Sequence, residues 1–277
     1  MEIGKYHTLK VLRETSVGYF LGNEVGEDVL LPNKFVPNDL KIDDEITVFI
    51  YLDSDERITA TTQTPEIIID SFAFLEVGSV NKVGAFLNWG IDKQLFVPFQ
   101  EQKSKMQEGE YHLVYMYLDE KTKRLTASSK WDKFIKKDAK ETLKEQEEVS
   151  VLVLGESPLG YNCIVNNAYK GLAYFNENFK EVSTGMQTKA YIKQVREDGK
   201  IDLLFEPPGV ASLEKHAETI LKILRKNGGF LPYHDKSDAE EVRQNLQMSK
   251  KAYKKAIGNL YKNKFITIEK NGVKLVD

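Results

Sequence analysis

The stretch KVGAFLNWGIDKQLFVPFQE, Lys82 to Glu101, matches SVGYFLGNEVGEDVLLPNKF, Ser16 to Phe35, without a gap at an offset of 66 residues. A third copy, PLGYNCIVNNAYKGLAYFNE, starts at Pro158, a further 76 residues along. The aligned glycines are Gly18, Gly84 and Gly160. Self-similarity of this kind indicates a repeated structural unit.

Each copy also ends alike, with an alternating apolar run, a polar turn and a second short run. These endings are DEITVFIYLDSDERITATT (Asp44 to Thr62), EYHLVYMYLDEKTKRLTASS (Glu110 to Ser129) and QTKAYIKQVREDGKIDLLF (Gln187 to Phe205). The distance from the aligned glycine to the first apolar residue of the last run is 40, 41 and 41 residues. Such runs predict strands, about five in each unit of roughly 60 residues. Five strands with a glycine that lets the second strand bend predict a small closed barrel.

Length and composition are those of a soluble, multi-domain protein. The chain has 277 residues, 41% of them hydrophobic and 29% charged, which suits two to four compact units. We expect no signal peptide and no membrane span, because the apolar runs are far shorter than the ~20 residues that a membrane helix needs. The single cysteine, Cys163, suits a reducing compartment. The expected location is therefore the cytoplasm.

Charge is distributed unevenly along the chain. The whole chain has a net charge of −3, but residues 212–277 hold 14 Lys and Arg against 8 Asp and Glu, a net charge of +6. A basic C-terminal part on an acidic body suggests that an anionic partner is met mainly at that end. The alternative is a lysine-rich face that is simply solvated.

The last 66 residues predict helices rather than a fourth barrel. Ser212 and Ser237 are expected N-caps, and Gly228 and Gly229 are an expected helix stop. A third helix is expected to begin after Ser249. Its predicted buried stripe consists of Tyr253, Ala256, Ile257 and Leu260, and the residues expected off that stripe are Lys250, Lys251, Lys254 and Lys255.

Two short apolar runs, FITIE and VKLV, follow the third helix. The Asn271-Gly272 pair between them predicts a hairpin. Three helices and a hairpin are typical of a winged helix, whose third helix faces the groove in DNA-binding members. Winged helices that bind other proteins are the alternative.

The predicted fold class is therefore mostly β with an α+β C-terminal domain: three tandem five-stranded barrels followed by a winged helix. The expected ranges are 1–63, 70–130 and 148–206 for the barrels, 131–147 for a linker helix and 212–277 for the winged helix. The Pro-Pro-Gly run from Glu206 to Ser212 is expected to be a second linker.

The repeat resembles the S1 form of the OB-fold, whose usual pattern is close to F-G-A-F-V followed by G-L-V-H-x-S-E. KGLAYFNE, Lys170 to Glu177, is its best single match. Three S1-like repeats followed by a winged helix ending MSKKAYKKAIGNLYKNKFITI resemble the conserved virulence factor B family of bacterial RNA-binding proteins. The resemblance covers nearly the whole chain. It implies single-stranded RNA as partner, a post-transcriptional role and no catalysis.

The S1 pattern is incomplete in each copy. Its first phenylalanine is replaced in all three copies, and its second is kept as Phe20 and Phe86 but is Asn162 in the third. Its histidine is Pro32, Pro98 and Tyr174. The resemblance therefore makes Phe86 and Tyr174 the first candidates for base stacking, and the third barrel the chief expected site.

Further candidates come from aromatic and basic residues near these positions, although a core role is equally open for each aromatic. The full set of expected RNA-binding residues is Phe20, Phe86, Trp89, Tyr161, Tyr169, Lys170, Tyr174, Lys250, Lys251, Lys254 and Lys255. Phe96 and Phe99 flank Pro98, and one of the two is expected in the core.

An enzyme is not expected. The four histidines, His7, His112, His216 and His234, are scattered without metal-ligand spacing, and Cys163 has no motif around it. We therefore expect no cofactor, no metal, no membrane partner and no small-molecule substrate. Two other functions stay open: a protein-interaction scaffold, for example on the ribosome, with degenerate S1 barrels, and a DNA-binding transcription regulator acting through the winged helix.

Overall fold

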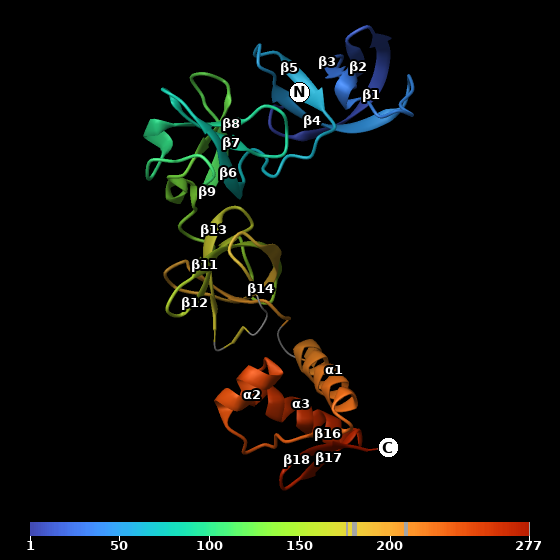
Figure 1. Ribbon diagram of the computed structural model, residues 1–277, viewed down its shortest axis with the longest axis vertical. Coiled ribbons are helices and arrows are strands. Elements are labelled where there is room, and N and C mark those ends of the chain that lie inside the picture. Colours follow the sequence, from blue (N-terminus) through green and yellow to red (C-terminus); the bar gives the residue numbers. More distant parts are fainter. Residues whose placement is uncertain (176, 179–181, 208–209, 277) are drawn as a thin grey trace. The chain divides into compact units, whose positions relative to one another are not determined.

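A computed structural model of the chain describes residues 1–175, 177–178, 182–207 and 210–276, without the side chains of 210–215. It divides into two compact units, Met1–Ile135 and Lys136–Asp277. The first unit holds two barrels, and the second holds a third barrel and the helical region. Figure 1 shows the strands of the first barrel in blue and the three helices in orange to red.

Each barrel consists of five strands that close on themselves. Barrel 1 comprises β1 (Tyr6–Thr15), β2 (Gly18–Gly22), β3 (Asp28–Pro32), β4 (Glu45–Leu52) and β5 (Ile58–Thr61). Barrel 2 comprises β6 (Phe72–Val80), β7 (Gly84–Asn88), β8 (Leu95–Pro98), β9 (Tyr111–Leu118) and β10 (Leu125–Ser128). Barrel 3 comprises β11 (Glu148–Glu156), β12 (Gly160–Val165), β13 (Tyr169–Tyr174), β14 (Gln187–Val195) and β15 (Ile201–Leu204). The prediction of three five-stranded barrels is confirmed.

The repeated glycine has the same place in all three barrels. Its strand partners are Pro32 for Gly18, Pro98 for Gly84 and Tyr174 for Gly160. A Cβ atom at these glycines would lie 2.1, 2.3 and 2.1 Å from a backbone carbonyl oxygen of the facing strand. The repeat therefore needs glycine because the facing backbone comes too close for any side chain.

The predicted linker helix over 131–147 is wrong. The structure has a 3-10 turn, η3 (Trp131–Phe134), and then turns and irregular chain up to β11. Ala139 and Leu143 are buried in the core of barrel 3. Only one helical turn links them, closed by the amide of Leu143 donating to the carbonyl of Ala139 at 2.9 Å. Burial of these two apolar side chains takes precedence over the weak helix propensity of a charged segment.

The C-terminal part is a winged helix, as predicted. Its elements are α1 (Val210–Lys226), β16 (Phe230–Leu231), α2 (Ala239–Leu246), α3 (Lys250–Lys262), β17 (Ile266–Glu269) and β18 (Gly272–Leu275). The strands form a sheet in the order β16-β18-β17. The predicted stripe of α3 is buried along its whole length. The linker expected over Glu206 to Ser212 lies partly outside the described residues.

The helix caps agree only in part with the sequence pattern. Ser249 caps α3 by accepting from the amide of Ala252 at 3.0 Å, as expected. Helix α2 is capped by Asp238 rather than Ser237, whose hydroxyl instead accepts from the amide of His234 at 2.9 Å. Helix α1 begins at Val210, two residues before Ser212. A carboxylate one residue closer to the helix competed successfully for the role of N-cap.

Candidate nucleic-acid interface

The S1-type aromatic position lies in the middle of each second strand, between two neighbours. Phe20 of β2 lies between Arg13 and Leu30. Phe86 of β7 lies between Ser79 and Phe96. Asn162 of β12 lies between Gly155 and Leu172. The three barrels therefore present the same position in three different chemical settings.

In barrel 1 an arginine covers the aromatic ring. The guanidinium carbon of Arg13 lies 4.0 Å from the centre of the Phe20 ring. Asp28 holds that guanidinium with an ion pair of 2.8 Å. A base could stack on Phe20 only if Arg13 moved, or could stack on the guanidinium plane instead.

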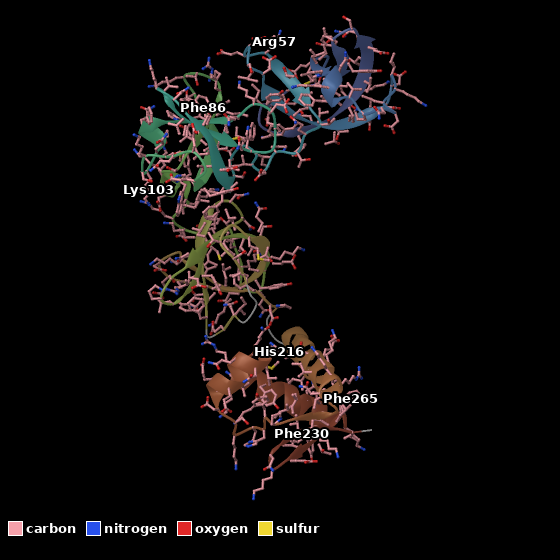
Figure 2. The ribbon with its side chains drawn as sticks, viewed as in Figure 1. Arg57, Phe86, Lys103, His216, Phe230 and Phe265 are labelled. Carbon is pink, nitrogen blue, oxygen red and sulfur yellow. The ribbon has the colours of Figure 1, made fainter. Side chains whose placement is uncertain are left out.

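In barrel 2 the same position holds a partly exposed phenylalanine that lies beside a second aromatic ring. Phe86 and Phe96 are both partly exposed, with ring centres 5.1 Å apart and planes at 34°. Ser79 replaces the arginine, and its hydroxyl donates to the Gln94 side chain at 2.9 Å. No cation lies over either ring among the side chains described. Figure 2 labels Phe86 on this barrel.

Trp89 is a core residue, so its predicted role as a stacking surface is wrong. Its side chain is only 2% exposed. Its indole N–H donates to the carbonyl of Lys93, and its ring makes an edge contact with Phe49 of barrel 1, with ring centres 5.7 Å apart. Trp89 therefore joins the cores of barrels 1 and 2.

Barrel 3 offers less than its tyrosine-rich sequence suggests. Tyr169 is 4% exposed and its hydroxyl donates to Thr142 at 3.0 Å, so this predicted site residue also belongs to the core. Tyr161 is half-buried and packs edge-on against Phe175 and at a tilt against Phe205, with ring centres 5.0 and 6.0 Å apart. Lys170 is exposed on β13. The sequence left both a core role and a stacking role open for these tyrosines, because tyrosine has an apolar ring and a polar hydroxyl.

Tyr174 is partly exposed, but an arginine engages it. Its hydroxyl accepts from the guanidinium of Arg196, whose carbon lies 5.7 Å from the ring centre. Asp202 holds Arg196 with an ion pair of 2.6 Å. This arginine–aspartate arrangement resembles the one over Phe20, although the aromatic residue comes from a different strand.

The first two turns of α3 carry an exposed group of lysines. Lys251, Lys254 and Lys255 are exposed, and Lys250 is half-buried with its ammonium 3.5 Å from the carbonyl of Lys236. The first turn has no acidic residue. Cations at a helix N-terminus face the positive end of the helix dipole, and neighbouring lysines repel one another. This cluster of positive charge is therefore unfavourable for the helix itself, and it suits an anionic ligand.

Two features of this surface were not recognised as site residues from the sequence. Phe96 is the cross-strand partner of Phe86, and it aligns with Leu30 and Leu172 in the other copies. The repeat register could have identified it, because the aligned pair is aromatic on both strands only in the second copy. The arginine covers gave no such signal, since Arg13 belongs to the neighbouring strand of Phe20 and Arg196 follows the end of β14, which does not pair with the strand of Tyr174.

Groups for catalysis are dispersed in the described part of the chain. No three His, Cys, Asp or Glu side chains described there come together to hold a metal ion. Burial raises the pKa of the Cys163 thiol to about 12, which disfavours its nucleophilic form. No helix among the described residues is long and apolar enough to cross a membrane.

Comparison with known proteins gives matches at both ends of the chain. Residues 3–63 match the S1 domain, and residues 218–275 match the CvfB-like winged helix domain. Both are nucleic-acid-binding domain types.

Curated relatives match over nearly the full length. The chain is 31% identical to the uncharacterized protein YitL of Bacillus subtilis, covering 95% of this chain and 90% of YitL. It is 28% identical to conserved virulence factor B of Staphylococcus aureus strain USA300, covering 99% and 94%. A solved structure, a multidomain protein with nucleic acid binding domains from Streptococcus pneumoniae, is 22% identical over 99% of this chain and 98% of that chain, with a TM-score of 0.40.

Proposed function

Because the chain belongs to the conserved virulence factor B family, we propose that it is a regulatory protein that binds single-stranded RNA and acts in post-transcriptional control of gene expression. The S1-type barrels would hold the bases, and the basic face of α3 would hold phosphates. Neither role requires a cofactor.

The open Phe86–Phe96 pair is the observation that carries this proposal. Aromatic side chains on an OB-type sheet stack bases of single strands, at about 1–3 kcal/mol per base. In barrel 1 Arg13 already covers the corresponding aromatic, Phe20. In barrel 3 the corresponding residue is Asn162, while Arg196 engages Tyr174 and Tyr169 is buried. We therefore propose barrel 2 as the main stacking surface, in place of the third barrel that the sequence pattern favoured.

The lysines of α3 support a second contact. Exposed ammonium groups such as those of Lys254 and Lys255 neutralise phosphates and release counterions, which makes affinity depend strongly on salt. They read charge rather than base identity, so the same helix surface also suits DNA.

The test is a fluorescence anisotropy titration of the full chain with short labelled single-stranded RNA at about 50 mM salt, where electrostatic contacts are strong. Saturable binding to RNA that exceeds binding to duplex DNA of equal length supports the proposal. Absence of RNA binding would refute it. Equal or tighter binding to duplex DNA would favour a transcription regulator acting through the winged helix.

A protein-interaction scaffold, for example one associated with the ribosome, is the second candidate. The arginine covers over Phe20 and Tyr174 favour it, because two barrels then lack a free aromatic platform. Ribosome co-sedimentation that persists when Phe86 and Phe96 are both replaced by leucine would favour this alternative.

A further inference from the structure

We infer that a pocket between barrels 1 and 2 takes one base of the bound RNA that is turned away from its neighbouring bases. These two barrels then form a single composite site. This inference rests on the proposed function and specifies where the base goes. A flat aromatic platform would tolerate any base, whereas a pocket encloses one.

The pocket has a volume of about 270 Å³ and is lined by both barrels. Barrel 2 contributes the Phe86–Phe96 pair and Leu125, and barrel 1 contributes Tyr51, Leu52 and Ser54. The Phe86–Phe96 pair therefore shares this pocket with the end of β4 and the β4–β5 turn of barrel 1.

Size and lining together favour a single planar group. The volume lies just below the ~300–1,000 Å³ typical of sites for drug-sized ligands and cofactors. Aromatic and aliphatic side chains make up most of the wall, and Ser54 and Gln94 add polar groups that could hydrogen-bond the edge of a base. Such a combination suits a nucleobase, which has an apolar face and a polar edge.

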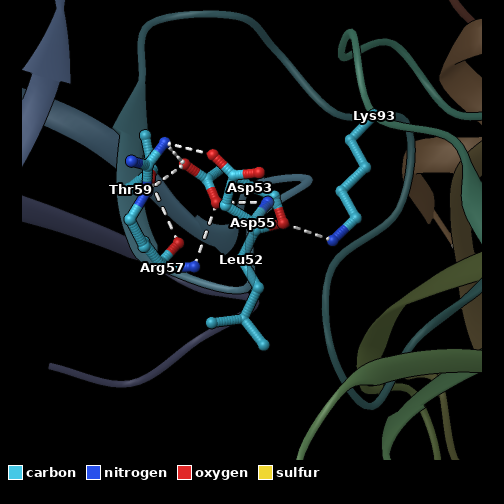
Figure 3. Close-up of polar contacts among 6 residues, drawn as sticks. All are labelled: Leu52, Asp53, Asp55, Arg57, Thr59 and Lys93. Atoms are coloured by element: carbon cyan, nitrogen blue, oxygen red, sulfur yellow. Dashed lines mark hydrogen bonds and ion pairs between the residues drawn. The ribbon is translucent and has the colours of Figure 1, made fainter.

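The wall contributed by barrel 1 is held in place before any ligand binds. The ammonium of Lys93 in barrel 2 donates to the carbonyls of Leu52 and Asp53, each at 2.8 Å. Figure 3 shows the Lys93 side chain pointing toward this turn of barrel 1. Asp53 also accepts from the Arg57 side chain at 2.7 and 3.0 Å across the turn. Burial lowers the pKa of Lys93, since desolvation disfavours its charged form. These contacts fix the turn against barrel 2, so little ordering is needed on binding.

Charge at the rim suits a nucleotide rather than a neutral aromatic. Arg124 of barrel 2 lines the pocket and forms an ion pair with Glu56 of barrel 1. Both side chains are about half exposed, so the pair contributes little to stability and exchanges easily. A phosphate that followed the base to the rim would compete with Glu56 for Arg124.

The first experiment fills the pocket from barrel 1. Ser54→Phe is expected to weaken binding of single-stranded RNA roughly tenfold, the loss of about one stacked base. The matched control is Ser16→Phe, an equal change at an exposed position of barrel 1 outside the pocket. Circular dichroism is the control that tests whether both variants keep the wild-type fold.

A local signal accompanies this titration. The chain has two tryptophans, so Trp131→Phe leaves Trp89, which borders the pocket, as the only one. RNA is expected to change Trp89 emission in this background and not when Ser54→Phe is added. Unchanged emission and equal affinity of the Ser54 and Ser16 variants, with intact RNA binding by the wild type, overturn the composite site alone. No RNA binding by the wild type overturns the proposed function itself.

A second variant tests the same pocket if Ser54→Phe disturbs folding. Glu56→Gln frees Arg124 and is expected to tighten RNA binding several-fold, with a steeper salt dependence by about 0.7 in the logarithmic slope for one added phosphate contact. Asp55→Asn removes an equal charge from the same turn but does not line the pocket. Equal effects of the two substitutions would contradict a phosphate at Arg124.

Discussion

At the scale of single residues, neighbours decide which aromatic residues are available to a ligand. Phe20 and Phe86 occupy the same place in two copies of the repeat, yet Arg13 covers one and Phe96 flanks the other. The position in the motif therefore predicts where an aromatic ring lies. The residue paired with it on the neighbouring strand decides whether a base can reach the ring.

This difference gives a matched pair of substitutions. Phe86→Leu keeps most of the apolar volume but cannot stack, so we expect the dissociation constant for single-stranded RNA to rise about 5- to 150-fold, in line with one lost stack. Phe20→Leu is expected to change it by less than about twofold, because Arg13 already covers that ring. Anisotropy titrations of both variants measure this, and equal losses would contradict the assignment to barrel 2.

The cysteine provides a test that concerns burial rather than ligand binding. Because burial raises the pKa of Cys163 to about 12, the native thiol is almost fully protonated at pH 8. We expect a disulfide reagent such as dithionitrobenzoate to react at least ~100-fold faster with Cys163 in denaturant than in the native chain. Rapid labelling of the native protein would show that the β12 strand is accessible.

At the scale of elements, the glycines illustrate two opposite effects of one substitution. Gly84→Ala places a Cβ 2.3 Å from the carbonyl oxygen of Val97 and is expected to destabilise barrel 2 by roughly 1–3 kcal/mol. Gly258→Ala lies within α3 with open space around the added methyl, and is expected to stabilise the winged helix by about 0.5–1 kcal/mol. Scanning calorimetry of the full chain separates these outcomes, and stabilisation by Gly84→Ala would refute the close-approach explanation.

The lysines in the first two turns of α3 are unfavourable for the helix, and we propose that they bind RNA phosphates. Lys251→Glu places a carboxylate in the first turn and removes repulsion from Lys254 and Lys255, so we expect a stability gain of about 0.3–1 kcal/mol. The same change should weaken RNA binding and lower the salt slope. Thermal melts and salt titrations are the measurements, with Lys262→Glu in the last turn as the control for added acid. A more stable variant with unchanged RNA affinity would show that α3 does not contact the RNA.

Element boundaries were predictable where local chemistry decides them. The place of the aligned glycine in the second strand of each barrel, and the Ser249 cap of α3, could be predicted from the sequence. The linker helix could not, because Ala139 and Leu143 pack into a barrel core that begins with β11. Gly272 illustrates the same limit: it begins β18 beside the carbonyl of Leu231, 2.1 Å from an added Cβ, so its role is close approach rather than turn geometry.

At the scale of the whole molecule, the repeat predicted the architecture but not the site. The three barrels follow from the repeat, and the winged helix follows from helix caps, the apolar stripe of α3 and the hairpin that ends the chain. The burial of Trp89 and the pocket beside Phe86 depend on residues from another barrel, such as Phe49 and Ser54. Contacts between two barrels cannot be read from the repeat, so the sequence pattern favoured the third barrel, whereas we propose barrel 2.

The most direct test of the central claim, that this chain binds single-stranded RNA through barrel 2 and helix α3, is ultraviolet crosslinking of the full chain to RNA followed by peptide mass spectrometry. We predict crosslinked peptides that contain Phe86 or Phe96, together with peptides from α3, and their loss when unlabelled single-stranded RNA competes. Crosslinks confined to barrel 1 or barrel 3 would contradict the account. So would a crosslink yield with single-stranded RNA no higher than the yield with duplex DNA.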